Sequence, residues 1–344
     1  MQTTWQSGIK PMIAGQLVAE TAKAEGVVVR ETPDGGKSPP GSSRAARATQ
    51  TEPASRVLRV TVCACTYRRP NGLAALLKGL GKQTFTSLTR PSVGIVIADN
   101  EGSDQAKEAC DQFKRSCDIP IEYVHEARRG ISHARNACLA RLQDDCDFFA
   151  MIDDDEIPDP DWIEQLLLAQ QGADADVVQG RVLPVLPDGA PNWIVAGRYF
   201  GWDPLMDRVK GAQLNGYARL ERARTNNVLV KYAVVRELGL RFDPRFALTG
   251  GEDIVFFQAI NAAGRRIVHA PLACVREIVP PERTTLEYLC RMCYRLGCND
   301  RFKAPGRRKP NSGIKHILRR KLRSIGGYAV LRGMALLIGN LLRG

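Results

Sequence analysis

"FFAMIDDDEIPDPDW", residues 148–162, joins a short apolar run to four consecutive acids without a spacer. The run has the length and composition of a buried strand, which we predict over residues 147–153. Neighbouring carboxylates repel one another, and the packing of a core does not require them. The stretch therefore indicates a site for positive charge at the end of a strand.

Strand-like and helix-like segments alternate on either side of this stretch. The expected strands are 56–66, 93–100, 121–125 and 147–153, and the expected helices are 70–82, 103–115 and 131–142. Such alternation predicts an α/β fold with a mostly parallel, doubly wound sheet. Ligands bind beyond the carboxyl ends of the strands in such sheets, so the residues that follow the strands are the candidates for a site.

The second half of the chain alternates less regularly. Strands are expected at 175–183, 225–231 and 265–271, helices at 250–264 and 284–297, and an irregular stretch at 184–224. Residues 29–55 are rich in Pro, Gly, Ser and Ala and poor in large apolar residues, which predicts disorder. We therefore expect a disordered or weakly structured extension at 1–55, a main domain at 56–300 and a tail at 301–344.

The net charge of +12 belongs to the tail. Residues 301–344 contain 12 of the 49 Lys and Arg and no acid, so the other 37 basic residues balance the 37 acids. Residues 314–325 have one apolar and one basic helical face, which favours association of 306–344 with an anionic membrane surface. The apolar segment 326–342 is too short for a spanning helix and contains Arg332. The alternative is a basic helix packed on the domain. Nucleic acid is not the expected partner, because the tail offers few aromatic side chains for stacking.

The cysteines and the first residues bear on the compartment. The ten cysteines are scattered, and residues 1–28 contain no readable secretory signal. These observations predict free thiols in a reducing cytoplasm. Cys290 and Cys293 have the CxxC spacing, but neither a second pair nor a nearby histidine completes a zinc site.

The acids after the strand suit a divalent cation. Mg²⁺ and Mn²⁺ prefer oxygen ligands and usually bind one or two carboxylates plus substrate phosphates. On an extended backbone, Asp153 and Asp155 lie on the same side and face the ligand crevice. The alternative is a solvated loop that caps the next helix, which accounts for Asp159 or Asp161 but not for the acids directly after the strand.

A second acidic pair, Glu252 and Asp253, follows a Gly-Gly turn at the start of the predicted helix 250–264. Acids in a first helical turn are favoured by the helix dipole. A general base at a helix N-terminus, beside flexible backbone that a substrate approaches, is the other interpretation. The sequence pattern alone leaves both open.

Several short segments occur in a fixed order over most of the main domain. They are CTYRRP (65–70), VIADN (96–100), ISHARNACL (131–139), DFFAMIDDDE (147–156), TNNVLVK (225–231), TGGEDIVFF (249–257) and VPPERTTLEYL (279–289). Together they resemble the family 2 glycosyltransferases, which have the GT-A fold. The resemblance implies a UDP-sugar as the donor substrate and Mn²⁺ or Mg²⁺ as the cofactor.

The resemblance also implies roles for residues in the nucleotide pocket. Thr66, Tyr67, Arg69 and Asp99 would line it, with Asp99 accepting a hydrogen bond from the imide N–H of uracil. Arg135 would lie near the ribose and the diphosphate.

The acidic residues take the remaining roles that the resemblance implies. Asp154 would contact the ribose. Asp153 and Asp155 would form the D-x-D motif, with Asp155 as the direct metal ligand. Asp253 would be the catalytic base, and Glu252 beside it an acceptor contact or a substitute base.

Three arginines complete this set. Arg291 and Arg295, one helical turn apart, would hold the leaving diphosphate. The family has histidine where this chain has Arg276, so we expect Arg276 to neutralise phosphate rather than to help bind a metal.

The resulting functional expectation is an inverting, metal-dependent hexosyltransferase. It would move a hexose, with glucose as the first candidate, from a UDP-sugar to a lipid-linked oligosaccharide at the inner face of the cell membrane, in exopolysaccharide or cell-surface polysaccharide synthesis. A metal-dependent phosphohydrolase or nucleotidyltransferase, or a non-catalytic, membrane-attached nucleotide-binding module, is the alternative. A dinucleotide-dependent redox enzyme is not expected, because no GxGxxG motif follows the first strand.

Overall fold

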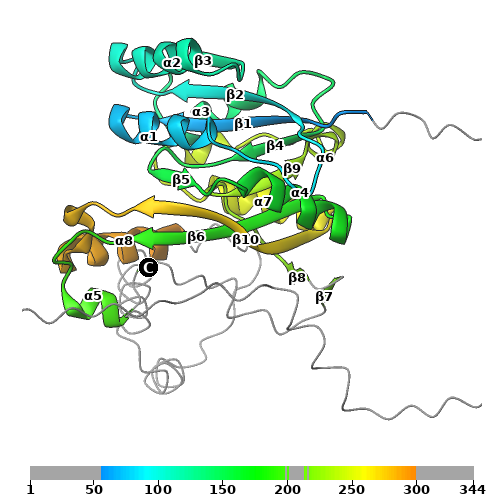
Figure 1. The fold of residues 1–344 in the computed structure, drawn as a ribbon. Helices are drawn as coiled ribbons and strands as arrows, with labels where there is room; N and C mark the ends of the chain where they lie inside the picture. The colour runs from blue at the N-terminus through cyan, green and yellow to red at the C-terminus, as the bar shows by residue number, and fades with distance from the viewer. Residues whose placement is uncertain (1–55, 198–199, 201–212, 215–216, 300–344) are drawn as a thin grey trace, which may run out of the picture. The chain divides into compact units, whose positions relative to one another are not determined.

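A computed structural model describes residues 56–197, 200, 213–214 and 217–299 (Figure 1). The expected extension 1–55 and the expected tail 301–344 lie outside the described residues, so their boundaries stay predictions. Among the helices in the described part, none is both long enough and apolar enough to cross a membrane.

The described residues build one mixed sheet with helices packed against it (Figure 1). The strands are β1 (Arg59–Thr66), β2 (Ser92–Asp99), β3 (Ile121–His125), β4 (Phe148–Met151), β5 (Glu156–Pro158), β6 (Val177–Val185), β7 (Gln213–Leu214), β8 (Tyr217–Leu220), β9 (Val228–Lys231) and β10 (Ile267–Ile278). The helices are α1 (Pro70–Leu80), α2 (Asp104–Ser116), α3 (Ile131–Leu139), α4 (Trp162–Ala173), α5 (Asn192–Gly197), α6 (Tyr232–Glu237), α7 (Glu252–Ala262) and α8 (Leu286–Asn299), with short 3₁₀ turns η3 (Pro244–Phe246) and η4 (Pro281–Thr284). The strand order is β3-β2-β1-β4-β9-β6-β10-β8-β7, and β5 pairs with β10.

The two faces of the sheet carry separate hydrophobic cores. Side chains alternate along each strand, so Val60 and Val62 of β1 pack against α1, α2 and α4, whereas Cys63 packs on the other face with α3, α6 and α7. Trp162 of α4 and Phe257 of α7 are fully buried on opposite faces. This two-sided packing is the doubly wound arrangement that the alternation of segments predicts.

The direction of the strands differs between the two halves of the sheet. β1 pairs in parallel with β2 and β4, and β2 with β3, as expected. β9 runs antiparallel between β4 and β6, and β10 pairs in parallel with β6 but antiparallel with β5 and β8. The α/β class is confirmed. The second half of the sheet is mixed because β9 runs in the direction opposite to its neighbours β4 and β6.

β10 is longer than the strand expected at 265–271. The expectation ends at Pro271, because proline cannot donate a ladder hydrogen bond. In the structure the pairing of β10 with β6 shifts register between Ala270 and Cys274, and this bulge lets the strand continue to Ile278. The extension carries Glu277 to the carboxyl edge of the sheet, where the candidate site lies.

A buried asparagine fixes this bulge. The Asn227 side chain accepts a hydrogen bond from the Trp162 Nε1–H at 2.7 Å and donates to the carbonyl oxygens of Arg181 and Ala273, both at 2.9 Å. Gly180 provides the space, because a Cβ there would lie 2.3 Å from the Asn227 Oδ1. One side chain thus joins α4, β6 and the bulge of β10.

Candidate active site

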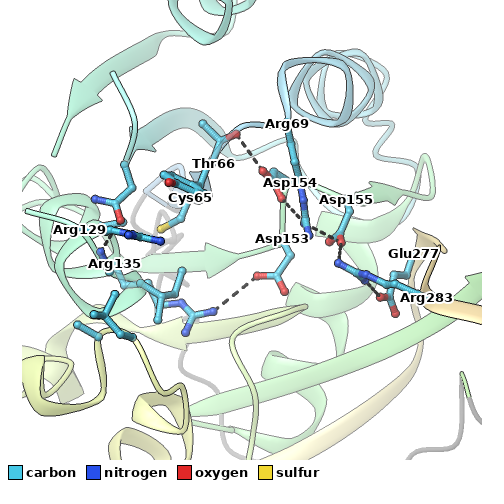
Figure 2. A pocket seen from close by; sticks show the side chains of 17 residues that line it. Cys65, Thr66, Arg69, Arg129, Arg135, Asp153, Asp154, Asp155, Glu277 and Arg283 are labelled. Atoms are coloured by element: carbon cyan, nitrogen blue, oxygen red, sulfur yellow. Dashed lines mark hydrogen bonds and ion pairs between the residues drawn. The ribbon is translucent and has the colours of Figure 1, made fainter. Parts of the chain in front are cut away.

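A cavity of about 580 Å³ opens at the carboxyl ends of β1 and β4 (Figure 2). The residues predicted from the sequence that line it are Thr66, Tyr67, Arg69, Arg135, Asp153, Asp154 and Asp155. The lining also includes Asn100, which lies at the end of the predicted second strand, and Arg129, Glu277 and Arg283, which were not predicted as site residues. The parallel strands β1 and β4 end at the same edge, which explains why motifs about 90 residues apart meet here.

The acids after β4 do not continue the strand. The backbone turns at Asp153, whose carbonyl accepts from the N–H of Glu156 at 3.1 Å, while the Asp153 N–H donates to the Glu156 carboxylate at 3.0 Å. The expected extended backbone would have placed only alternate acids in the cavity. The turn instead directs Asp153, Asp154 and Asp155 toward it, where Asp154 and Asp155 share Arg69 as a partner and Asp153 faces Arg135 (Figure 2).

Asp154 joins the first strand to the first helix. Its carboxylate is buried and accepts from the Thr66 hydroxyl and from the Arg69 guanidinium, both at 2.9 Å. Burial raises the pKa of Asp154, and the Arg69 charge and the Thr66 hydrogen bond oppose that rise. Gly72 permits the close approach of α1, because a Cβ there would lie 2.4 Å from the Asp154 carbonyl oxygen.

Asp155 lies between two arginines. Its Oδ2 accepts from Arg69 at 2.8 Å and from Arg283 at 2.9 Å, and Arg283 also donates to Glu277 at 2.9 Å. We call the chain Asp155–Arg283–Glu277 the Arg283 bridge (Figure 2). Burial and the neighbouring Asp155 raise the pKa of Glu277, and Arg283 opposes them. Arg283 belongs to the motif VPPERTTLEYL, so its position after the last long strand was the available signal.

Asp153 faces Arg135 across the cavity. The two side chains approach to 3.6 Å, and Arg135 also forms a short ion pair with the buried Glu252. Burial within the cavity raises the pKa of Asp153 to about 6, Arg135 opposes this, and the neighbouring carboxylates add to it. The side chain is nevertheless 43% exposed to the open cavity, so solvent reaches the carboxylate and screens these charges.

The two acids of α7 have different surroundings. Glu252 is 3% exposed and lies behind Arg135, and its Oε2 has no hydrogen-bond partner among the described residues. Asp253 is partly exposed, accepts from the N–H of Ile254 at 2.8 Å and does not belong to the cavity lining. The structure thus associates Glu252 with Arg135, and the roles predicted for both acids stay predictions.

Asp99 lies below the lining rather than in it. Its carboxylate is 1% exposed and accepts from the backbone N–H groups of Glu101 and Ser103 and from the Tyr123 hydroxyl, at 2.8–2.9 Å. These bonds order the loop after β2, and the role of Asp99 toward uracil stays a prediction. Tyr67 does face the cavity, with the Arg129 guanidinium 5.9 Å from its ring centre.

Among the described residues, two of the expected phosphate-binding arginines, Arg276 and Arg291, do not line the cavity. Arg276 points away from it and pairs with Asp159 at 2.9 Å, because neighbouring residues of a strand face opposite sides and Glu277 takes the cavity side. The structure places Arg283 rather than Arg276 in the cavity lining, and the role of Arg276 toward phosphate stays a prediction. Arg291 is exposed and pairs with Glu287. The side chain of Arg295 lies outside the described residues.

The lining as a whole carries charges of both signs. Its charged residues are Asp153, Asp154, Asp155, Glu277, Arg69, Arg129, Arg135 and Arg283. Within the described ranges, no three His, Cys, Asp or Glu side chains are arranged to hold a metal ion by themselves. A hard divalent cation nevertheless fits the carboxylates of Asp153 and Asp155 when a ligand supplies further oxygen atoms. Such a lining suits a bound cation together with a diphosphate.

Comparison with known proteins identifies the family. Residues 61–230 match the model of Glycosyl transferase family 2, and residues 148–343 match Glycosyl transferase family group 2. The succinoglycan biosynthesis protein ExoM of Rhizobium meliloti (strain 1021) is 32% identical over 243 residues, which cover 71% of this chain and 74% of ExoM. The chain belongs to glycosyl transferase family 2. This membership confirms the resemblance inferred from the motifs, and the chain is a glycosyltransferase.

Other members and solved structures are more distant from this family 2 glycosyltransferase. A glucosyl-dolichyl phosphate glucuronosyltransferase of Haloferax volcanii is 27% identical over 67% of this chain and 73% of its own. The mannosyltransferase PcManGT of Pyrobaculum calidifontis, solved with GDP-Man and Mn²⁺, has a TM-score of 0.53 at 18% identity, covering 84% of this chain and 77% of its own. GalNAc-T7, solved with UDP, GalNAc and Mn²⁺, has a TM-score of 0.52 at 15% identity, covering 78% of this chain and 55% of its own. The chain spans 65% of the solved S. aureus TarS 1–349, with a TM-score of 0.48. The GT-A fold expected from the motifs is confirmed.

Proposed function

We propose that this glycosyltransferase is an inverting, metal-dependent enzyme that transfers a hexose, with glucose as the first candidate, from a UDP-sugar to a lipid-linked oligosaccharide in exopolysaccharide synthesis. The observation that carries the proposal is the cavity lined by both the Asp153–Asp155 turn and arginines. The similarity to ExoM supports the pathway class, and the UDP and GDP-Man in the distant structures support a nucleotide-sugar donor.

The donor nucleotide is held by the first strand and the third helix. The Tyr67 ring offers a face for the base at the mouth of the cavity, and Asp154 accepts from the ribose. Arg69, Arg135 and Arg283 all present guanidinium groups to the cavity. A guanidinium binds phosphate oxygens through parallel hydrogen bonds, so these arginines orient the diphosphate and neutralise part of its charge.

A divalent cation is part of the proposal, because Mn²⁺ accompanies the nucleotides in both distant structures and hard oxygen donors meet at the turn after β4. Asp155 and Asp153 would hold it. When bound, the cation supplies Lewis-acid stabilisation of the negative charge that develops on the leaving diphosphate. An assay with a panel of sugar donors, run with either Mn²⁺ or Mg²⁺, determines which ion the enzyme uses.

Acceptor activation is assigned to Asp253. It lies in the first turn of α7, directly after Glu252, and the loop before this turn ends in Gly250 and Gly251, both at positive φ and without side chains. The carboxylate takes the proton of the acceptor hydroxyl as that oxygen attacks the sugar from the face opposite the diphosphate. A single displacement of this kind inverts the anomeric configuration. The neighbouring Glu252 forms an ion pair with Arg135.

The acceptor and the location follow from the tail and the relatives. We place the enzyme in the cytoplasm, peripheral on the inner face of the cell membrane through residues 306–344. The basic composition of that segment fits an anionic surface, and the neutral main domain offers no comparable excess of charge. A lipid-linked acceptor would present its sugar at that surface.

The test is a donor panel. The protein is incubated with UDP- and GDP-sugars, with Mn²⁺, Mg²⁺ or EDTA, and with lipid-linked oligosaccharides, and the released nucleoside diphosphate and the product linkage are measured. We expect UDP release that requires both a divalent ion and a glycosyl acceptor, and loss of turnover in Asp155→Ala. Full activity in EDTA would refute the requirement for a metal ion. Hydrolysis of nucleotides that carry no sugar would indicate the phosphohydrolase alternative.

A further inference from the structure

The Arg283 bridge occupies one of the two carboxylate oxygens that Asp155 can offer a cation. Asp155 Oδ2 accepts hydrogen bonds from both Arg69 and Arg283. The side chains of Asp155 and Arg283 are 16% and 18% exposed, so solvent screens their attraction only partly. Two guanidinium groups at this distance repel a divalent cation and block its approach to Oδ2.

The bridge is built so that Arg283 can change partners without leaving the wall of the cavity. Its Nη1 is held by Glu277, and its Nη2 is the arm that reaches Asp155. The backbone beneath it is fixed, since the hydroxyl of the buried Thr284 donates to the Pro281 carbonyl at 2.7 Å. Because Arg283 already lines the cavity, a rotation of its side chain about the Glu277 contact would turn Nη2 from Asp155 toward a ligand.

Arg69 is less free to exchange. The same Nη1 atom that contacts Asp155 also contacts Asp154, and the residue forms the N-cap of α1. A shift of Arg69 away from Asp155 would leave Asp154, which is 5% exposed, with one charged partner fewer. Arg283 is thus the guanidinium that Asp155 can release at the lower cost.

We propose that Arg283 is a positioning residue that exchanges Asp155 for the diphosphate of the donor. In the nucleotide-free enzyme it neutralises Asp155 and keeps the affinity for divalent cations low. When the donor binds, the Nη2 arm moves to a phosphate oxygen, and Asp155 Oδ2 keeps only its hydrogen bond from Arg69, which leaves a lone pair for the cation. Cation and nucleotide then bind with positive coupling, each strengthening the other by the same factor. This inference rests on the proposed donor and metal site.

The test measures binding rather than turnover. Mn²⁺ is titrated by calorimetry or by its electron paramagnetic resonance signal, with and without saturating UDP, and with GDP in parallel. Arg283→Gln is compared with the wild type and with the matched control Arg276→Gln. Arg276 lies near the end of β10, and its described side-chain hydrogen bonds go to Asp159, outside the cavity.

We expect Arg283→Gln to bind Mn²⁺ in the absence of nucleotide about five- to fiftyfold more tightly than the wild type, because one competing charge is gone. We expect its UDP affinity without metal to fall, and the coupling factor between Mn²⁺ and UDP to fall by about tenfold. Arg276→Gln should leave all three quantities within twofold of the wild type. Arg283→Lys keeps the charge but cannot hold both carboxylates in parallel, so its coupling should lie between those of the wild type and Arg283→Gln.

Two outcomes would overturn the inference in different ways. If UDP or GDP binds with Mn²⁺ and neither Arg283 variant changes the coupling, the exchange is wrong while the proposed function stands. If neither nucleotide binds with any divalent ion, the proposed donor site is wrong, and the proposed exchange is wrong with it. Circular dichroism and thermal melting of each variant show whether it is folded, and the Lys variant decides the question where the Gln variant does not fold.

Discussion

Replacement of Asn227 is the change whose effect on stability the structure predicts most clearly. Asn227 is 0% exposed, and its side chain satisfies three polar groups in the core: the Trp162 indole N–H and the carbonyl oxygens of Arg181 and Ala273. Asn227→Ala removes two buried hydrogen bonds, to Trp162 and Ala273, and a partly buried one, to Arg181. A buried polar group that loses its partner costs about 1–3 kcal/mol.

The magnitude follows from these three bonds. With partial relaxation of the surroundings, we expect Asn227→Ala to lower the free energy of unfolding by about 3–5 kcal/mol. In a domain of this size that is a decrease in Tm of roughly 6–15 °C. Asn227 also has a φ of 117°, which glycine adopts without strain. Asn227→Gly should therefore be about 1 kcal/mol less destabilising than Asn227→Ala, although both lose the same hydrogen bonds.

The assay is equilibrium unfolding in urea, followed by tryptophan fluorescence and circular dichroism. Asn226→Ala is the matched control, because Asn226 is the neighbouring residue and its side chain makes one hydrogen bond within the described part of the chain, to Glu156 at 3.3 Å. The control should lose less than about 1 kcal/mol. If Asn227→Ala unfolds at the same urea concentration as Asn226→Ala, these three hydrogen bonds do not stabilise the core.

Three further predictions concern other parts of the chain. Asp253→Asn should lower turnover by about 10²–10⁴ while leaving nucleotide affinity unchanged, and normal turnover would exclude it as the base. Burial raises the pKa of Glu164, but the backbone N–H groups of residues 86–88 outweigh it and hold the pKa below its ordinary value. The carboxylate therefore stabilises the fold above its unfolded pKa and loses this effect as pH falls through the folded pKa. Glu164→Gln should cost about 2 kcal/mol at pH 7 and much less at pH 3, as urea unfolding at both pH values would show; an equal cost at both would refute the assignment. Deletion of 306–344 should release the protein from anionic vesicles in a sedimentation assay, and unchanged sedimentation would show that the tail is not the anchor.

Much of the site was predictable, because its signals are local. One predicted strand runs directly into acids, and other motifs directly follow other predicted strands. Because parallel strands end at the same edge of a sheet, these segments identify that edge as the site. Thr66, Arg69, Arg135 and the Asp153–Asp155 turn lie together in the cavity for that reason. The order of the motifs was sufficient to predict the family, and the comparisons confirm it.

Other features depend on long-range pairing. Whether Arg276 or Glu277 faces the cavity is decided by the register of β10, which shifts at a bulge beside Pro271. The partnership of Asp155 with Arg283 joins residues 128 positions apart. Charge alone does not select these partners, because the sequence contains 49 Lys and Arg and 37 acids.

The sequence by itself determined the fold class, the family and the edge of the sheet where the chemistry lies, because side-chain periodicity and strand ends are properties of short segments. Only the tertiary structure decided that β9 runs antiparallel between β4 and β6, that Asp99 is engaged by its own loop, and that Arg283 holds Asp155. Those facts depend on how distant segments return to one another, and a side chain finds its partner only after the backbone has brought the two together.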